Sequence, residues 1–183
     1  MRFSIIFLII LCISNLFSPV QSSQENILNN LFNQLGETDD SKSAALLEKK
    51  IWSIWNVHPT NNKLTDRLEF ATELMQYGDY NYALIVFDNI IVTDPKWSEA
   101  WNKRATVYFL MNQFINSLND IDKVLNLEPR HFGALSGQAR IFIKLKKYEM
   151  AIKSIERALE FYPSFKSSNL IPGIERLIKE GSI

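Results

Sequence analysis

Two histidines and a few arginines are the side chains of this sequence whose types and spacing could do chemistry. His131 follows Arg130 in the stretch LEPRHFGAL, and Arg140 lies further along the same segment. Ionisable groups that converge in a concavity could bind a small ligand or serve an acid–base reaction. A lone histidine without partners is not a site, however, and the position of His131 after Pro129 favours a role in starting a helix. We therefore expect architecture at His131, with a ligand or enzyme site of Arg130, His131 and Arg140 as the alternative.

Other catalytic and metal-binding patterns are missing from the sequence. His58 lies in the turn-like stretch NVHPTNN without a second histidine at helical spacing, and no HExxH pattern occurs. No phosphate-binding glycine loop and no GxSxG elbow is present. Asp120 and Asp122, like the pair Asp39 and Asp40, read as solvated acids. We expect no catalytic residue, no metal and no cofactor.

The first residues predict export. Arg2 is followed by the apolar run IIFLIILCI and the small polar close VQSS, a pattern typical of a secretory signal peptide cut after about Ser22. The run is too short for the ~20 apolar residues of a membrane span, so a retained anchor is the less favoured alternative. Cleavage would also remove the single cysteine, Cys12. We expect a signal peptide over 1–22 and no stable membrane insertion after its removal.

The charge balance argues against nucleic acid as a partner. The chain carries 20 Lys and Arg residues against 20 Asp and Glu residues. Its lysines are dispersed, whereas binding to a phosphate backbone needs a concentrated basic surface.

A period of 34 residues organises most of the chain. Pro95, Pro129 and Pro163 stand one period apart. The same step links six further sets of positions, namely Ala71, Ala105 and Ala139; Leu74, Tyr108 and Phe142; Tyr80, Phe114 and Tyr148; Ala83, Ser117 and Ala151; Phe87, Ile121 and Ile155; and Ile90, Val124 and Ala158. Apolar residues three and four apart within each copy predict two amphipathic helices per period. The small residues mark where those two helices approach closely.

The middle copy, WNKRATVYFLMNQFINSLNDIDKVLNLEP, resembles the tetratricopeptide repeat family, whose unit is a 34-residue helix–turn–helix. The resemblance implies an all-α fold, a short right-handed superhelix of antiparallel helix pairs. Three repeats are expected over 63–166, at about 64–97, 98–131 and 132–165. The segments WNKRAT and EPRHFGAL also resemble exported bacterial repeat proteins, which implies the bacterial periplasm or cell envelope.

Helices are expected on both sides of the repeats. Residues 23–62 read as a hairpin resembling a degenerate leading repeat, with Asp40 or Ser41 capping its second helix and with Ile51, Trp52 and Trp55 packing on the repeat that follows. Residues 167–183 read as a capping helix and tail, with Ile174, Leu177 and Ile178 facing inward. Such a helix would cover the apolar end of the stack. About nine helices are expected in all.

The family resemblance also implies a binding surface, because the first helix of each unit lines a concave groove. Carried over by position, the groove candidates are Thr72, Met75, Asn102, Thr106, Phe109, Arg140 and Lys144. Phe109 could anchor a peptide, Asn102 could bond its backbone, and Arg140 could pair with a carboxylate. The family's carboxylate clamp for chaperone tails is not reproduced. We expect a non-enzymatic scaffold or assembly adaptor that binds a protein or peptide, and self-association through the stack ends stays open.

Overall fold

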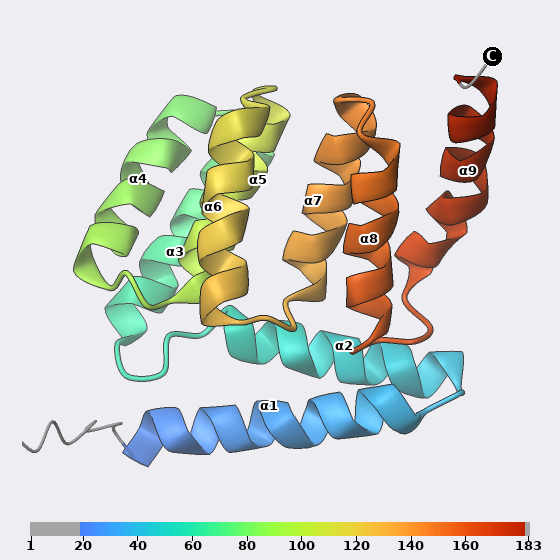
Figure 1. The fold of residues 1–183 in the computed structure, drawn as a ribbon. Coiled ribbons are helices and arrows are strands. Elements are labelled where there is room, and N and C mark those ends of the chain that lie inside the picture. The colour runs from blue at the N-terminus through green and yellow to red at the C-terminus, as the bar shows by residue number, and fades with distance from the viewer. Residues whose placement is uncertain (1–18, 182–183) are drawn as a thin grey trace, which may run out of the picture.

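The repeats form a row of antiparallel helix pairs. The computed structural model describes residues 19–181, in which all regular structure is helical. The pairs are α3 (Asn62–Gln76) with α4 (Tyr80–Thr93), α5 (Ser98–Leu110) with α6 (Phe114–Leu127), and α7 (Phe132–Lys144) with α8 (Tyr148–Leu159) (Figure 1). The all-α repeat architecture expected from the sequence is confirmed. No helix between residues 19 and 181 combines the length and apolarity needed to span a membrane.

The small residues of the repeat pattern lie where the two helices of a pair meet. Ala71, Ala105 and Ala139 on the first helices are buried, as is Ser117 on α6. The Ser117 hydroxyl donates a 2.7 Å hydrogen bond to the carbonyl oxygen of Ala105. A larger side chain at either position would separate α5 from α6, because packed interiors tolerate little extra volume.

The turn inside each repeat needs a left-handed residue at one position. Gly78 has φ +85°, and the residues one and two periods later, Asn112 and Lys146, have φ 58° and 56°. This conformation brings Cβ close to the backbone in every residue except glycine. The turn geometry is therefore kept in all three repeats, while only the first has the residue that adopts it without strain.

The N-terminal hairpin is made of α1 (Pro19–Glu37) and α2 (Ser41–Trp55). Asp40 caps α2 as expected, because its Oδ2 accepts a 2.8 Å hydrogen bond from the Ser43 amide. Residues 1–18 of the predicted signal peptide lie outside the described residues. α1 begins at Pro19 and so extends across the predicted cleavage position.

The packing predicted for this hairpin is wrong. Its two helices lie across the ends of the repeat helices instead of stacking beside α3 (Figure 1). Trp52 and Trp55 consequently meet His131 and Phe132 at the start of the third repeat, with ring centroids 4.0–5.5 Å apart. Trp97, at the end of the first predicted repeat, also joins them, and its indole Nε1 donates to the Trp55 carbonyl oxygen at 3.0 Å.

A second contact holds α2 near the end of α8. The Tyr162 hydroxyl donates a 3.0 Å hydrogen bond to Oε2 of Glu48. Burial and the Glu48 carboxylate raise the pKa of the Tyr162 phenol to about 12. The hairpin is therefore tied to the third repeat at two places far apart in the sequence.

The C-terminal segment covers one end of the stack. It consists of a 3-10 turn, η1 (Lys166–Leu170), and α9 (Ile171–Glu180), which packs on α8. Ile174 is buried and Ile178 packs against the same apolar cluster, as expected. Leu177 is 40% exposed, so its predicted inward orientation is wrong. α9 packs on the rest of the chain through one face, which carries Ile174 and Ile178, and Leu177 lies outside that face.

Asp120 also departs from the sequence prediction. It is 4% exposed and not a solvated acid. Both of its oxygens accept hydrogen bonds from Arg104, at 2.7 and 2.8 Å, and Arg104 also reaches Asp88 of the preceding repeat at 2.7 Å. The guanidinium therefore makes a bidentate pair with Asp120 of its own repeat and links that repeat to the preceding one through Asp88.

Replacement of Lys146 by glycine is expected to raise the free energy of unfolding by about 0.5–1 kcal/mol. Glycine removes the left-handed strain, and part of this gain is offset by greater freedom of the unfolded chain. Denaturant unfolding measures the change. Lys144→Gly, at the last residue of helix α7, is the matched control and should lower stability by up to about 1 kcal/mol. A loss of stability in Lys146→Gly would contradict the strain at this turn.

Candidate functional site

His131 is an architectural residue, as expected. It is fully buried, and its Nδ1 accepts a 3.1 Å hydrogen bond from the Ala134 amide, which caps α7. Because an amide can only donate, Nδ1 carries a lone pair and the ring proton sits on Nε2. Nε2 lies 3.0 Å from Oε2 of Glu99. Both ring nitrogens are therefore committed to structural partners.

Glu99 of α5 is the buried partner of His131. Its side chain is fully enclosed, and it also accepts from Asn102 at 3.2 Å and lies 3.3 Å from Lys103 Nζ. Burial by itself would raise the pKa of Glu99, but the hydrogen bond from His131, with Lys103 and Asn102 beside it, lowers the pKa below its ordinary value. The folded state therefore favours the ionised carboxylate.

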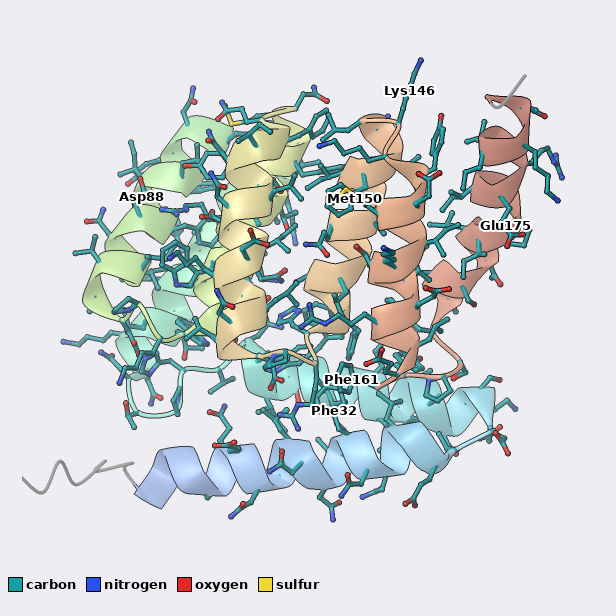
Figure 2. The ribbon with its side chains drawn as sticks, in the orientation of Figure 1. Phe32, Asp88, Lys146, Met150, Phe161 and Glu175 are labelled. Atoms are coloured by element: carbon teal, nitrogen blue, oxygen red, sulfur yellow. The ribbon has the colours of Figure 1, made fainter. Side chains whose placement is uncertain are left out.

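The segment EPRHFGAL is the surface on which the hairpin docks. The His131 ring stacks on the Trp55 indole with centroids 4.0 Å apart and an angle of 8° between the planes. Arg130 pairs with both oxygens of Glu128 at 2.8 Å, and its guanidinium lies 4.5 Å from the ring centroid of Phe32 on α1. Figure 2 places Phe32 between α1 and the turns above it. These contacts give Arg130 and His131 a structural role in docking the hairpin.

The docking of the hairpin also requires a glycine at position 133. A Cβ atom built at this position would lie 2.5 Å from the Trp52 ring, closer than real side chains approach. Trp52 cannot retreat easily, because its ring packs edge-on against Trp55, His131 and Phe132. The glycine therefore permits the hairpin to reach the third repeat.

His58 repeats this pattern at the start of the first repeat. It lies in the turn between α2 and α3, as predicted, and its Nδ1 accepts from the Asn61 amide at 3.0 Å. Its Nε2 lies 2.8 Å from Oδ2 of Asp94, and its ring packs edge-on to Trp97. Both histidines thus join a turn to an acid of a neighbouring repeat.

A groove lies between α5 and α7. Its volume is about 420 Å³, and aromatic side chains form much of its wall. Four of the five candidate binding residues of α5 and α7, Asn102, Thr106, Phe109 and Arg140, line this groove, together with Trp52, Phe132 and Phe165. Lys144, Thr72 and Met75 do not line it. The groove is closed on one side by α2, which supplies Glu48 and Trp52.

The four groove residues differ in whether their side chains already have partners within the chain. Asn102 is buried, and one N–H of its side-chain amide donates to Glu99. The Thr106 hydroxyl donates to the Asn102 carbonyl oxygen, and Phe109 packs against Phe114. Arg140 is exposed and makes no hydrogen bond or ion pair with the described residues. Arg140 therefore offers an unpaired charge to a ligand, whereas part of the hydrogen-bonding capacity of Asn102 is used within the chain; its binding role stays a prediction.

The alternative site of Arg130, His131 and Arg140 is not assembled. Arg130 faces the hairpin, His131 is enclosed, and Arg140 lies at the groove. In the part of the chain covered by residues 19–181, no three His, Cys, Asp or Glu side chains gather as metal ligands would.

Glu99 and the aromatic hairpin contacts were missed by sequence reasoning. A usable indication was the 34-residue step itself, which maps Asp94 onto Glu128 and Trp97 onto His131. Both acids accept a hydrogen bond from the amide two residues later, at 2.9 Å for Asp94 and 3.1 Å for Glu128. The period therefore marks the turns as repeated structures, although it does not name their partners.

Comparison with known proteins agrees with this geometry. A family profile described as Tetratricopeptide repeat matches residues 133–165. A TPR repeat-containing protein of Rhizobium etli is 36% identical over 149 residues, which cover 80% of this chain and 72% of that protein. The chain belongs to the tetratricopeptide repeat family. This tetratricopeptide repeat protein also matches Hsp70-Hsp90 organizing protein of Triticum aestivum, at 24% identity over 64% of the chain but only 20% of that protein.

The solved structures show the same fold. The first TPR of Spaghetti (RPAP3), bound to an HSP90 peptide, superposes with a TM-score of 0.61 at 24% identity, covering 64% of this chain and 94% of that one. Tetratricopeptide repeat proteins such as these mediate protein–protein interactions. Nothing in these similarities points to nucleic acid as a ligand.

Replacement of Gly133 by alanine is expected to lower the free energy of unfolding by about 1–3 kcal/mol, because the new methyl group displaces Trp52 from a packed cluster. Thermal and denaturant unfolding measure the loss. The control is Gly137→Ala on the same helix, where a Cβ would lie 3.6 Å from Ile121, an ordinary contact. That change should stabilise α7 by up to about 1 kcal/mol. Equal effects of the two substitutions would contradict the docking contact.

Glu99→Gln tests the buried acid through its pH dependence. The pKa of Glu99 is lowered on folding, so its charge stabilises the protein above the unfolded-state pKa, and this contribution is lost as pH falls through the folded pKa. The variant should be less stable by about 1 kcal/mol at pH 7, and the difference should shrink below about pH 4. Chemical denaturation at several pH values measures both. If the stability difference between the wild type and Glu99→Gln grew as the pH fell, the pKa of Glu99 would be raised on folding and not lowered.

Proposed function

We propose that this chain is an exported, non-enzymatic adaptor that binds an extended peptide segment of a partner protein in the groove between α5 and α7. The observation that carries the proposal is a groove of about 420 Å³ that has aromatic walls and the unpaired Arg140 beside them. Grooves of this kind offer a pocket for a buried anchor and a polar group that orients it.

The groove favours one kind of peptide. Trp52, Phe109 and Phe165 surround space suited to a bulky apolar side chain. Arg140 would pair with an acidic side chain or a terminal carboxylate of the same segment, because its guanidinium has no other partner among the described residues. An apolar anchor followed by an acid is therefore the expected motif.

The similarity to the first TPR of Spaghetti, which was solved with an HSP90 peptide, supports peptide binding by this fold. Function by analogy of fold needs a site of its own, and Arg140 with its aromatic neighbours is the site argued for here. The lysine and asparagine pairs of the carboxylate clamp are not reproduced in this sequence, so a chaperone tail is not the proposed ligand.

Location in the bacterial periplasm or cell envelope is part of the same proposal. It rests on the leader pattern of residues 1–22 and on the resemblance of WNKRAT and EPRHFGAL to exported bacterial repeat proteins. Both ring nitrogens of His131 contact structural partners, the Ala134 amide and the Glu99 carboxylate. This supports a scaffold over an enzyme that uses His131.

The proposal is tested with a photo-crosslinking residue in place of Phe109 and, as a control, in place of Lys153 on the outer helix α8. One discrete adduct from position 109 alone is expected, and mass spectrometry of the adduct gives the bound segment. That segment, made as a peptide, should bind about tenfold or more weakly to Arg140→Ala than to the wild type, since a charged contact is lost. Lys153→Ala should bind like the wild type.

Equal adducts from both positions, or equal peptide affinity of the Arg140→Ala and Lys153→Ala variants, would contradict binding in this groove. Crosslinking of the chain to itself would instead indicate self-association.

A further inference from the structure

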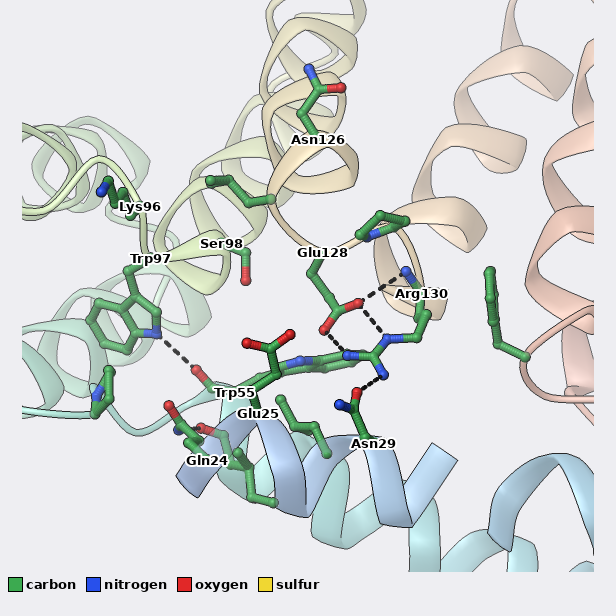
Figure 3. A pocket seen from close by; sticks show the side chains of 16 residues that line it. Gln24, Glu25, Asn29, Trp55, Lys96, Trp97, Ser98, Asn126, Glu128 and Arg130 are labelled. Atoms are coloured by element: carbon green, nitrogen blue, oxygen red, sulfur yellow. Dashed lines mark hydrogen bonds and ion pairs between the residues drawn. The ribbon is translucent and has the colours of Figure 1, made fainter. Parts of the chain in front are cut away.

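A second, larger cavity borders the hairpin junction. Its volume is about 920 Å³, and it is enclosed by α1, the end of α2 and the turns that precede α5 and α7 (Figure 3). It shares no lining residue with the groove between α5 and α7. We name it the turn pocket. Its size is within the range of cavities that hold small ligands.

Trp55, which lines the turn pocket, carries a donor without a partner within residues 19–181. Trp55 is 4% exposed, and its indole Nε1 has no hydrogen-bond partner among the described residues. The other three indoles are paired: Trp52 donates to Glu48, Trp97 to the Trp55 carbonyl oxygen and Trp101 to the Pro95 carbonyl oxygen. Buried indole N–H groups normally find an acceptor. Figure 3 shows the indole of Trp55 within the ring of side chains that line the pocket.

Two opposite charges at the turn pocket are also free. Arg130 is neutralised by Glu128, and its Nη1 donates to the side-chain oxygen of Asn29. Glu25 on α1 and Lys96 in the turn before α5 line the pocket, are exposed and take part in no ion pair among residues 19–181. The pocket therefore offers one carboxylate, one ammonium and one buried N–H donor to a ligand.

We propose that the turn pocket binds a small zwitterion, an amino acid or a short peptide that carries both a free ammonium and a free carboxylate. The ligand carboxylate accepts from Trp55 Nε1 and faces Lys96, and its ammonium faces Glu25. Ser98 and Asn126, which also line the pocket, supply further hydrogen-bonding groups. This binding is independent of the peptide groove, because the residues that carry it are different.

The test uses the ¹⁵N-labelled chain, with L-alanine and L-trialanine as separate probes. Each of the four tryptophans gives an indole N–H signal, and Trp55→Phe assigns the signal of Trp55. We expect a saturable downfield shift of the Trp55 signal with at least one probe, since a new hydrogen bond deshields the proton, while the Trp101 signal stays in place. The probe that binds more tightly tells a free amino acid from a short peptide as the source of the zwitterion.

Variants of the two charges locate the ligand. Glu25→Gln and Lys96→Gln should each weaken binding by about tenfold, because a charge-assisted contact is lost. Glu37→Gln, an exposed acid on the same helix, and Lys63→Gln, an exposed base on α3, should bind as the wild type does. Arg140→Ala should also leave the titration unchanged, which separates this site from the groove.

Three results would overturn the proposal. The first is an unmoved Trp55 signal with both probes. The second is equal binding of trialanine whose two termini are acetylated and amidated, since that peptide is not a zwitterion. The third is a titration weakened by Arg140→Ala and not by Glu25→Gln or Lys96→Gln, which would place the probe in the groove.

Discussion

The imidazole of His131 stacks on the indole of Trp55 at 4.0 Å while its two nitrogens bond the Ala134 amide and the Glu99 carboxylate. Through this one ring the hairpin, the second repeat and the third repeat are held in a single arrangement. Each partner is buried, so a shift of the hairpin would break the stacking and expose a charged acid to an incomplete set of partners. The position of α1 and α2 across the repeat ends depends on this contact.

The groove and the turn pocket both depend on the hairpin as well. α2 supplies Trp52 and Glu48 to the groove and Trp55 to the turn pocket. The two cavities therefore both border the aromatic cluster that docks the hairpin. A change in that cluster reaches both, whereas a change of Arg140 or Glu25 concerns only the cavity that it lines. This arrangement allows one rigid junction to shape two different surfaces.

The buried acids at the repeat junctions fit the same picture. Glu99, Asp120 and Glu128 are enclosed, and each has a base beside it: His131, Arg104 and Arg130. A buried carboxylate without a partner is costly, and a paired one is tolerated only in one geometry. The contact of His131 with Glu99 and the bond from Arg104 to Asp88 join neighbouring repeats, whereas Arg104 with Asp120 and Arg130 with Glu128 pair within one repeat or one turn. The apolar helix faces supply most of the stability.

Much of the fold follows from the sequence because repeat packing is local. Pro95, Pro129 and Pro163, with the small residues at Ala105 and Ser117, were enough to predict the helix pairs, their order and their close contacts. The family resemblance, carried over by position, placed Phe109 and Arg140 on the groove face. The turn residue Lys146 could be aligned with Gly78, although its left-handed conformation became visible only in the structure.

Contacts between segments far apart in the chain were decided by the tertiary structure alone. The sequence by itself determined that the chain is a helical repeat and that His131 starts a helix. It could not say that Trp55 would lie on His131, that Glu99 would be enclosed with it, or that Asp120 would be buried. Periodicity reports which face of a helix is apolar, whereas the angle at which a hairpin crosses a stack depends on the shapes of both surfaces.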